Sequence, residues 1–422
     1  MSSDCSAPVA ASTTRRPEPW PVGPTAFLEK PHRCDIHYAL AEPTTPGKCP
    51  CVFPIIEDRP GGDTSYFNNV PQAILAQAEL PAFKFELEKS AGKEEDGSYG
   101  REANVSNFPI STGLAGVSMK LQPGIMRELH WHADAAEWAF VVSGRVRTTL
   151  VDPAGRSETS DFGPGDVWYF PRGHGHQLET LGSEPCHFIL IFDNGYFSEF
   201  GTFSITDWMA QVPVETLAKS LRVDEDVLRG LPKGEVYFAK GVIPPEPSAA
   251  PVSGPNTTTL THKFPLMSQQ PMEFPGGREW LVDSSRFPIS RTMTGLVFEL
   301  DAGAIRTLHW HPNASEWQYV IGGQYRVTLF GAKGRYREEV LNPGDVGYIP
   351  QGYGHSIENI GPETGRILLG LNSGTFQKID LAEWIAGQPA DVLMTNLDLP
   401  ADQVAKLPRG DIFITDGLPP SS

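Results

Sequence analysis

Cysteine is scarce in this chain, and the cysteines present do not form a disulfide framework. The 422 residues contain five of them: Cys5, Cys34, Cys49, Cys51 and Cys186. An odd number without regular spacing excludes a disulfide-rich secreted scaffold and fits a reducing compartment. We interpret Cys34, Cys49 and Cys51 as free thiols in a poorly structured arm, although a metal site or a disulfide there stays open.

Long hydrophobic runs are also missing. No run approaches the ~18–20 apolar residues of a membrane span, and the first twenty residues lack the apolar core of a secretory signal. Arg15 and Arg16 form a twin arginine, but Pro17, Glu18 and Pro19 follow it in place of an apolar run. These features predict a protein that stays in the cytoplasm and does not enter a membrane.

Positive charge is in deficit. The chain has 34 Lys and Arg against 51 Asp and Glu, which gives a formal net charge of −17 and a pI of about 5.1. This balance excludes general binding to nucleic acid or to an anionic membrane surface. An anionic substrate would therefore need local help from a metal ion or a buried arginine.

What the chain does contain is one pattern that occurs twice. It reads Gly-(x)5-His-x-His-(x)4-Glu-(x)6-Gly, followed by Gly-(x)5-Pro-x-Gly-(x)2-His. The first copy runs from Gly124 to His176 and the second from Gly303 to His355, at a constant offset of 179 residues. Such an offset indicates a duplicated fold. The candidate metal ligands are His130, His132, Glu137 and His176 in the first copy, and His309, His311, Glu316 and His355 in the second.

The spacing of these residues suits a metal site inside a closed sheet. Alternation along a strand places His130 and His132 on one face and Trp131 on the other. A histidine from a distant strand can join them only where facing strands bring their inward side chains together. Three imidazoles and one carboxylate leave two adjacent positions open on an octahedral ion. Mn, Fe, Ni, Cu and Zn all remain possible from the donor set alone.

Composition along the chain predicts four segments. Short apolar runs broken by Gly, Pro and Asp between residues 114 and 192 favour the strands of a sandwich or barrel. Residues 203–229 and the region around 381–384 are typical of helices. The predicted segments are an extended arm (1–60), an N-terminal barrel domain (61–240), a Pro-rich linker (241–256) and a C-terminal barrel domain (257–422).

Longer strings around the repeated pattern resemble the bicupin oxalate decarboxylases of the cupin superfamily. They are Arg127–His132, Pro164–Pro171, Glu316–Tyr319 and Pro343–Tyr348. The resemblance covers about residues 60–415 and implies an all-β fold with added helices, made of two tandem cupin barrels (double-stranded β-helices). Thr180 departs from the usual motif, which has Asn there, as Asn359 does in the second copy.

The resemblance implies decarboxylation of oxalate to formate and carbon dioxide, with two Mn²⁺ per chain and dioxygen as a catalytic partner. It also implies a mobile lid over the N-terminal metal, which reads Ser-Glu-Asn-Ser-Thr in the family. Ser198, Glu199 and Thr202 match this lid, whereas Phe200 and Gly201 do not. Glu199 would then move protons, because a closed lid excludes water from the site.

Other side chains have expected roles around the two sites. Arg127 and Arg306 precede the first ligand of each copy by three residues, where a guanidinium can clamp a carboxylate. Tyr237 matches a tyrosine that the family places near the first site. His174 is expected to be a neighbour of the metal and not a ligand. Trp131 and Trp310 are expected to pack beside the two sites first, and to relay electrons second.

Three alternatives remain. The altered lid favours an oxalate oxidase, which would give carbon dioxide and hydrogen peroxide. A non-catalytic bicupin of the storage type would be expected to have lost ligands, and a third possibility is turnover of another small acid. Family members are commonly hexamers, so the resemblance also implies a homo-oligomer.

Overall fold

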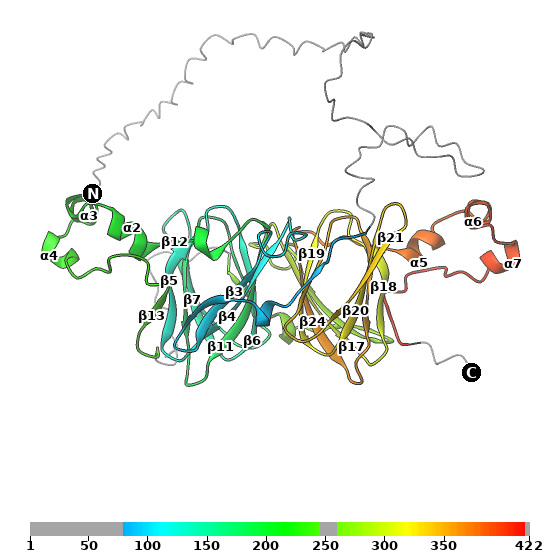
Figure 1. Cartoon of the computed structure of the whole chain (residues 1–422), viewed down its shortest axis with the longest axis horizontal. Helices are drawn as coiled ribbons and strands as arrows, with labels where there is room; N and C mark the ends of the chain where they lie inside the picture. Colours follow the sequence, from blue (N-terminus) through cyan, green and yellow to red (C-terminus); the bar gives the residue numbers. More distant parts are fainter. Residues whose placement is uncertain (1–78, 245–259, 418–422) are drawn as a thin grey trace, which may run out of the picture. The chain divides into compact units, whose positions relative to one another are not determined.

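A computed structural model of the chain describes residues 79–244 and 260–417, all within the compact unit Ala73–Ser422. The predicted arm, four of the five cysteines and most of the predicted linker lie outside the described residues. The described chain is mostly β-sheet with short helices (Figure 1). None of the described helices is long and apolar enough to cross a membrane.

The first barrel consists of two facing antiparallel sheets. One has the order β14-β9-β6-β11-β4-β3-β2, and the other has the order β12-β5-β10-β7-β8 with β13 also paired to β5. The strands of this half are β2 (Gly92–Glu95), β3 (Ser98–Ala103), β4 (Ala115–Leu121), β5 (Ile125–Trp131), β6 (Glu137–Ser143), β7 (Val146–Val151), β8 (Ser157–Phe162), β9 (Val167–Phe170), β10 (Gly175–Thr180), β11 (Cys186–Phe192), β12 (Phe203–Ser204) and β13 (Phe238–Lys240).

The second barrel repeats this arrangement. Its sheets have the orders β1-β22-β19-β24-β17-β16-β15 and β21-β20-β23-β18-β25, with β26 also paired to β18. The strands are β15 (Met272–Phe274), β16 (Gly277–Val282), β17 (Thr294–Leu300), β18 (Ile305–Trp310), β19 (Glu316–Gly322), β20 (Tyr325–Gly331), β21 (Arg335–Leu341), β22 (Val346–Ile349), β23 (Gly354–Asn359), β24 (Gly365–Leu371), β25 (Ile379–Asp380) and β26 (Ile414–Thr415).

One strand of each barrel comes from the other half of the chain. β1 (Lys84–Phe85) pairs with β22 of the second barrel, and β14 (Lys263–Phe264) pairs with β9 of the first. An ion pair accompanies each exchange: Lys84 to Asp345 at 2.8 Å, and Lys263 to Asp166 at 2.9 Å. The exchanged strands therefore tie the two barrels together, and the boundaries predicted for the domains do not separate their sheets.

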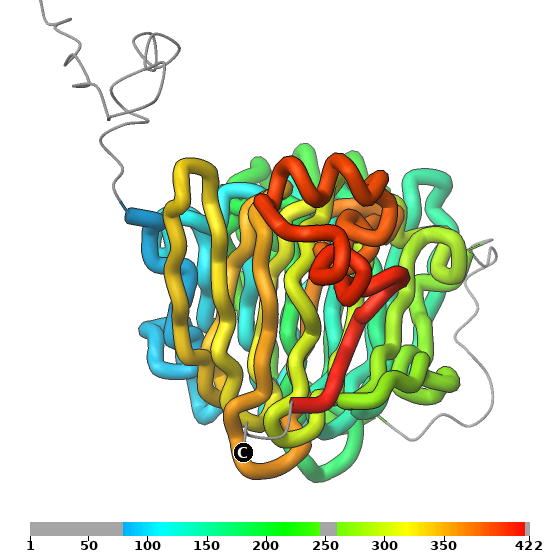
Figure 2. Tube along the Cα trace, turned by 90° about the vertical axis from the view of Figure 1, so that its right-hand side faces the viewer, coloured from blue at the N-terminus to red at the C-terminus, as the bar shows by residue number. Residues whose placement is uncertain are grey.

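Short helices follow the last barrel strand in each half. They are α2 (Ile205–Gln211), α3 (Val214–Leu221), α4 (Glu225–Leu228), α5 (Leu381–Ala386), α6 (Ala390–Leu397) and α7 (Ala401–Val404), with 3-10 turns η2 (Leu87–Lys89), η3 (Glu199–Gly201) and η4 (Leu266–Ser268). α2 contacts β5, and α5 contacts β18. In Figure 2 the α5–α7 segment and the chain that returns to β26 lie on the outside of the second barrel.

The cores follow from the alternation of apolar and polar residues. In β7 every second side chain is buried, whereas β6 and β24 are buried along most of their length because both faces are covered. Between the barrels, Trp138 packs on Gly295 and Trp317 packs on Gly116. A Cβ at either glycine would lie 1.9–2.1 Å from the indole, so only glycine fits there.

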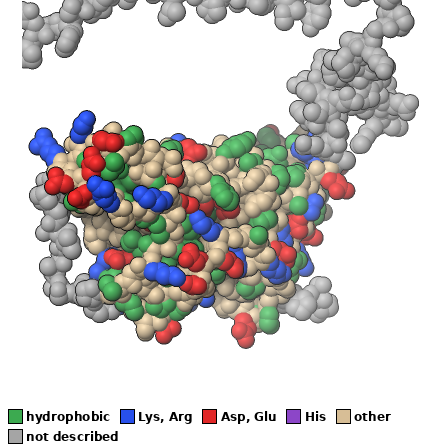
Figure 3. Space-filling view, turned by 60° about the vertical axis from the view of Figure 1, so that its left-hand side comes forward, with side chains coloured by type: hydrophobic (Ala, Val, Ile, Leu, Met, Phe, Trp, Pro, Cys, Tyr) green, Lys and Arg blue, Asp and Glu red, His purple; other side chains and the backbone are tan. Residues whose placement is uncertain are grey.

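The prediction of an all-β fold with added helices, in which the chain contains two barrels, is confirmed. The predicted helices after each barrel are also present. On the face drawn in Figure 3, acidic and basic side chains are interspersed and form no patch of one sign.

Candidate metal centres

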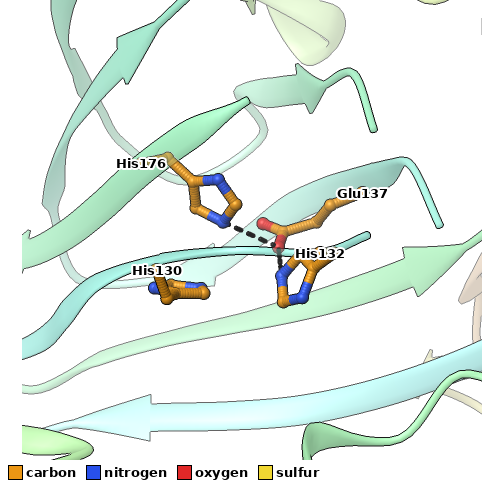
Figure 4. A group of neighbouring side chains, drawn as sticks. All are labelled: His130, His132, Glu137 and His176. Atoms are coloured by element: carbon orange, nitrogen blue, oxygen red, sulfur yellow. Dashed lines mark hydrogen bonds and ion pairs between the residues drawn. The ribbon is translucent and has the colours of Figure 1, made fainter. Parts of the chain in front are cut away.

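The first cluster of candidate ligands lies inside the first barrel. His130 is near the end of β5, His132 follows that strand, Glu137 opens β6 and His176 lies on β10, where it pairs with His130 across the sheet. One ligand atom from each of the four residues lies within 4.8 Å of the others. Figure 4 shows the side chains converging, with Glu137 Oε2 at 3.0 Å from His132 Nε2 and 3.5 Å from His176 Nε2.

Surrounding groups fix the orientation of these ligands. His130 Nδ1 faces the Glu128 carbonyl at 2.5 Å, and His176 Nδ1 faces the His174 carbonyl at 2.9 Å. Each contact directs the opposite ring nitrogen, Nε2, toward the centre. The Trp168 indole N–H donates to Glu137 Oε1 at 2.7 Å, which leaves Oε2 for the centre. Contacts of this kind set the tautomer and direction of a metal ligand.

Burial and neighbouring charges put His130 and Glu137 in their metal-binding protonation states. Burial, together with the nearby Arg127 guanidinium, lowers the pKa of His130 well below its usual value, so this imidazole is neutral. Burial would raise the pKa of Glu137, but contacts from His132 and His176 outweigh it and lower that pKa, so the group is a carboxylate. Neutral imidazoles and an ionised carboxylate are the forms that bind metal ions.

The second barrel holds an equivalent cluster. The ligand atoms of His309, His311, Glu316 and His355 also lie within 4.8 Å of one another, and all four side chains are buried. Here the Gln318 amide, instead of a tryptophan, donates to Glu316 Oε1 at 2.7 Å. The sequence thus predicted two clusters that the structure brings together.

The residues present fit a divalent metal ion. Among the described residues, the buried Nε2 atoms of His176 and His355 have no hydrogen-bond partner. A buried polar atom without a partner is costly, and a coordinated cation would remove that cost. Three nitrogens and one carboxylate oxygen suit first-row divalent metals.

Three predicted residues meet beside the first centre. Arg127 is buried, and its Nη2 lies 3.4 Å from Glu199 Oε2. The Tyr237 hydroxyl donates to the same Glu199 oxygen at 3.1 Å, and the Tyr237 ring lies flat against Arg127, with its centroid 3.9 Å from Cζ. Burial and the Glu199 charge raise the pKa of Tyr237 well above its usual value, so the phenol keeps its proton.

A cavity opens outward from this group. Its volume is about 680 Å³, and Glu199, Tyr237, Lys93 and Glu102 are among its lining residues. Lys93 forms an ion pair with Glu235 at 2.9 Å and lies over the outer face of Tyr237 at 3.8 Å. Glu199 therefore stands between the cavity and the buried Arg127.

The chain matches known proteins along most of its length. The family model described as Cupin matches residues 87–229 and again residues 266–405. Oxalate decarboxylase OxdC of Bacillus subtilis is 40% identical over 320 residues, which cover 76% of this chain and 83% of the relative. A probable oxalate decarboxylase of Arthroderma benhamiae is 30% identical over 342 residues, which cover 79% of this chain and 83% of the relative.

Solved structures give the same result. A structure of the Bacillus subtilis oxalate decarboxylase, from work on its Mn(II) centres, superposes with a TM-score of 0.77 at 37% identity and covers 81% of this chain and 90% of that one. The chain belongs to the bicupin oxalate decarboxylase family. It is therefore an enzyme of the oxalate decarboxylase class, and its two barrels are the tandem cupin barrels that the family resemblance implied.

Two carboxylates of this family member were not assigned roles from the sequence. Glu102 on β3 accepts hydrogen bonds from the Ser198 hydroxyl at 3.0 Å and from the Glu199 backbone N–H at 2.9 Å. It therefore fixes the turn η3 that presents Glu199. Glu128 accepts from the backbone N–H of Tyr237 at 2.7 Å and so anchors the Tyr237 loop to β5.

Tyr237 also has an unusual backbone. Its φ is +59°, a region that non-glycine residues rarely adopt. The Tyr237 backbone carbonyl accepts from the Glu128 N–H at 3.1 Å, so both backbone groups of Tyr237 are bound to one residue. These contacts hold the strained loop in place, and such strain is common at functional sites.

The buried arginine of the second centre has different surroundings. Arg306 Nη1 forms an ion pair with Asp380, and Lys378 forms an ion pair with the same carboxylate. The fixed offset aligns Lys378 with Glu199, whereas the strand register aligns it with Thr202. The Phe413 ring lies 3.7 Å from Arg306 Cζ, much as Tyr237 lies against Arg127. The second centre thus has an aromatic ring in the same position but no hydroxyl on it.

The remaining predicted residues lie near the centres without facing them. Trp131 stacks on Phe203 at 5.3 Å between ring centroids, and Trp310 meets Trp384 edge-on at 5.5 Å. His174 Nδ1 faces the Arg172 carbonyl at 3.1 Å, and His174 is outside the ligand cluster.

The departure from the family motif at Thr180 also has a structural explanation. The Thr180 hydroxyl donates to the Gln122 and Ile125 carbonyls, which ties β10 to the turn before β5. In the second barrel the Asn359 amide performs the equivalent task by donating to the Leu300 carbonyl. Cys186 is buried, and burial raises the pKa of its thiol to about 12, so it is an inert core residue.

Proposed function

We propose that this protein decarboxylates oxalate to formate and carbon dioxide at its first metal centre, with Mn²⁺ bound and dioxygen as a catalytic partner. The observation that carries the proposal is the meeting of Arg127, Glu199 and Tyr237 between the ligand cluster and the cavity. The second barrel lacks this group, because Arg306 pairs with Asp380 there and its aromatic neighbour Phe413 has no hydroxyl. The names of the relatives support the substrate and the metal.

His130, His132, Glu137 and His176 would hold the metal ion. When bound, it supplies a Lewis acid that polarises oxalate and a centre that can exchange an electron. The protein side chains then bind, orient and protonate the substrate.

Arg127 is suited to bind one carboxylate of oxalate. Among the described residues, its Nε and Nη1 atoms have no hydrogen-bond partner, although both are buried. A guanidinium with free N–H groups in a buried site forms strong charge-assisted hydrogen bonds with a carboxylate. This arrangement provides the local positive charge that a protein of net charge −17 needs to accept an anion.

Glu199 is suited to move the proton. Hydrogen oxalate loses its proton to Glu199, the carbon–carbon bond breaks to release carbon dioxide, and Glu199 returns the proton to the remaining carbon to give formate. The Tyr237 hydroxyl, which keeps its own proton, orients the carboxylate through a 3.1 Å hydrogen bond. The short turn η3 keeps water away from the reacting carbon while the proton is transferred.

The altered lid is compatible with this chemistry. Phe200 is 98% exposed, and no atom lies within 4 Å of a Cβ placed on Gly201. Both residues therefore lie on the solvent side of η3, where Phe200 is among the residues that line the cavity, while Glu199 reaches inward to Arg127. This geometry favours the decarboxylase over the oxidase, since the acid is in place. A cytoplasmic location and a hexameric assembly complete the proposal and rest on the cysteine pattern and on the family.

The test is removal of the lid acid. In Glu199→Ala we expect formate production to fall by at least about 100-fold, the usual contribution of general acid–base catalysis. Glu184→Ala, an exposed change in the turn before β11, is the control and should behave as wild type. Two metal ions per chain in both variants would show that the centres are intact. Undiminished formate production by Glu199→Ala would refute the assignment.

A further inference from the structure

The buried arginine of the second centre already has a carboxylate. Arg306 is 1% exposed and Asp380 is 0% exposed, and their ion pair is completed by a hydrogen bond from Arg306 Nη1 to the Phe413 carbonyl at 3.2 Å. The second oxygen of Asp380 is held by Lys378, which also contacts Glu383 and Asp411, each at 2.9 Å. Asp380 is thus fixed on both sides.

Sheet pairing identifies the corresponding residue in the first barrel. Asp380 on β25 lies opposite His309 on β18, and Ser204 on β12 lies opposite His130 on β5. Ser204 is neutral, and its hydroxyl donates to Glu235 at 3.1 Å. The two barrels therefore differ at one matched position, where the first has a serine and the second has an acid beside the arginine.

At a second matched position, the second barrel again has an acid where the first barrel has a neutral residue. Glu279 on β16 is offset by 179 residues from Gly100 on β3, where the Tyr237 hydroxyl would lie 2.7 Å from an added Cβ. Glu279 is 1% exposed, and neither of its oxygens has a hydrogen-bond partner among the described residues. Burial raises its pKa to about 7 against the opposing effect of Arg306, so a second acid lies near this arginine.

The cavities at the two centres differ in position and size: the one at the first centre is lined by Glu199 and Tyr237, and the one at the second by Arg306 itself. The hollow lined by Arg306, His309, His311 and Glu316 leaves about 0 Å³ for the centre of a water molecule. The cavity that reaches Glu199 at the first centre has about 680 Å³. Breaking a buried ion pair is costly, so an incoming dianion would have to displace Asp380 from Arg306 against that cost.

We propose that Asp380 is a built-in carboxylate that occupies Arg306 in place of a substrate carboxylate, so that the second centre holds a metal ion but does not take oxalate. The inference rests on the proposed function, because it takes oxalate as the substrate of the first centre. It assigns the difference in oxalate binding to Asp380, with Glu279 as a second acid near the same arginine, and both positions can be exchanged.

The experiment counts oxalate-binding sites on the Mn-loaded protein under nitrogen, where the dioxygen partner is absent. Calorimetry gives the number of oxalate ions bound per chain, and Mn(II) electron paramagnetic resonance gives the number of metal centres that respond. For wild type we expect one oxalate per chain and one of two metal centres perturbed. No binding at all would overturn the proposed function itself, whereas two oxalates would overturn only the role of Asp380.

Exchange variants then test the residue. Asp380→Ser, alone or with Glu279→Gly, gives the second barrel the residues of the first, and we expect two oxalates per chain. Ser204→Asp introduces the acid beside Arg127, and we expect oxalate binding to be lost while both metal ions remain. Asp411→Asn alters only an exposed partner of Lys378, and this variant should still bind one oxalate per chain.

Metal content and a cooperative thermal transition identify the variants that fold. If both Asp380 variants fold with two metal ions and still bind one oxalate, the inference is wrong. Unchanged oxalate binding by a folded Ser204→Asp protein would contradict it independently, through the other barrel.

Discussion

At the scale of single residues, Tyr237 decides how Glu199 is presented to the first centre. Its hydroxyl donates to Glu199 and its ring lies against Arg127, while its backbone N–H is bound by Glu128. The tyrosine therefore contacts both groups that handle the substrate. It contacts them through different parts of the side chain, so the two contributions can be separated by removing the hydroxyl alone.

Tyr237→Phe removes the hydroxyl and keeps the ring. Because one hydrogen bond to a charged group contributes about 1.5–3 kcal/mol, we expect kcat to fall by about tenfold or more, with a smaller change in KM. Tyr196→Phe, at a tyrosine that is 68% exposed, is the matched control and should leave both constants unchanged. Steady-state kinetics that show a change in KM alone would contradict the role of the hydroxyl.

The sequence predicted the site residues that occur in both copies of the repeat and missed residues, such as Glu102, that occur in one copy only. The eight ligands are found because their spacing repeats, and a strand places them in a predictable direction. Glu102 has no such signal: the offset of 179 aligns it with Leu281, and its partner Glu199 lies 97 residues away. Contacts across that distance depend on which strands pair, and local pattern does not encode strand pairing.

Asp380 was missed for a related reason. The constant offset aligns it with Gly201, but the second copy is three residues shorter after its last long strand. Sheet pairing aligns Asp380 with Ser204 instead, because both lie opposite the first histidine ligand. A short deletion in a loop is invisible to a fixed offset, and only the strand register shows the true correspondence.

At the scale of elements, the turn η3 is held by the strand next to it. Ser198 and the Glu199 N–H both donate to Glu102 on β3, while the Ser198 hydroxyl also accepts from the Phe200 N–H at 3.3 Å. These contacts set the turn, but they are single hydrogen bonds made by a segment of three residues, so the turn can also open. We therefore expect Glu102 to control how long the acid stays over the substrate.

In Glu102→Ala we expect kcat for formate to fall several-fold, and peroxide to rise as a share of products because water and dioxygen reach the intermediate. Glu95→Ala on β2 is the control, since Glu95 is exposed and contacts no part of η3 that the structure describes. Glu102→Gln keeps one oxygen acceptor for the Glu199 N–H and should restore part of the loss. Equal loss in the Ala and Gln variants, with no change in products, would indicate a structural role only.

At the scale of the whole molecule, the two barrels are joined by exchanged strands and by partly buried polar contacts. Glu88 on η2 accepts from the Ser118 hydroxyl in the first barrel and from the Tyr319 hydroxyl, at 2.9 Å, in the second. Burial would raise the pKa of Glu88, but hydrogen bonds led by that from His187 outweigh it and lower the pKa to about 2. The sequence could not predict these contacts between the barrels, because the two-residue strand β1 is too short to show an alternation of apolar and polar residues.

This shift predicts an acid-sensitive contribution to stability. The folded pKa lies below the unfolded value of 4.5, so the contribution is complete above about pH 4.5 and is lost as the pH falls toward 2. We expect Glu88→Gln to destabilise the protein by about 2 kcal/mol at neutral pH and by little near pH 2. Denaturant unfolding at several pH values, with the exposed Glu86→Gln as control, measures the difference. A difference that does not change with pH would contradict the assignment.

The central claim is that the first centre cleaves oxalate without net oxidation. The most direct test is to load the protein with Mn²⁺, supply oxalate in air, and quantify formate, carbon dioxide and hydrogen peroxide together. Because Glu199 is held between Arg127 and the cavity, we expect about one formate for each carbon dioxide and almost no peroxide. Carbon dioxide and peroxide with little formate would contradict the account and show an oxidase on the same scaffold.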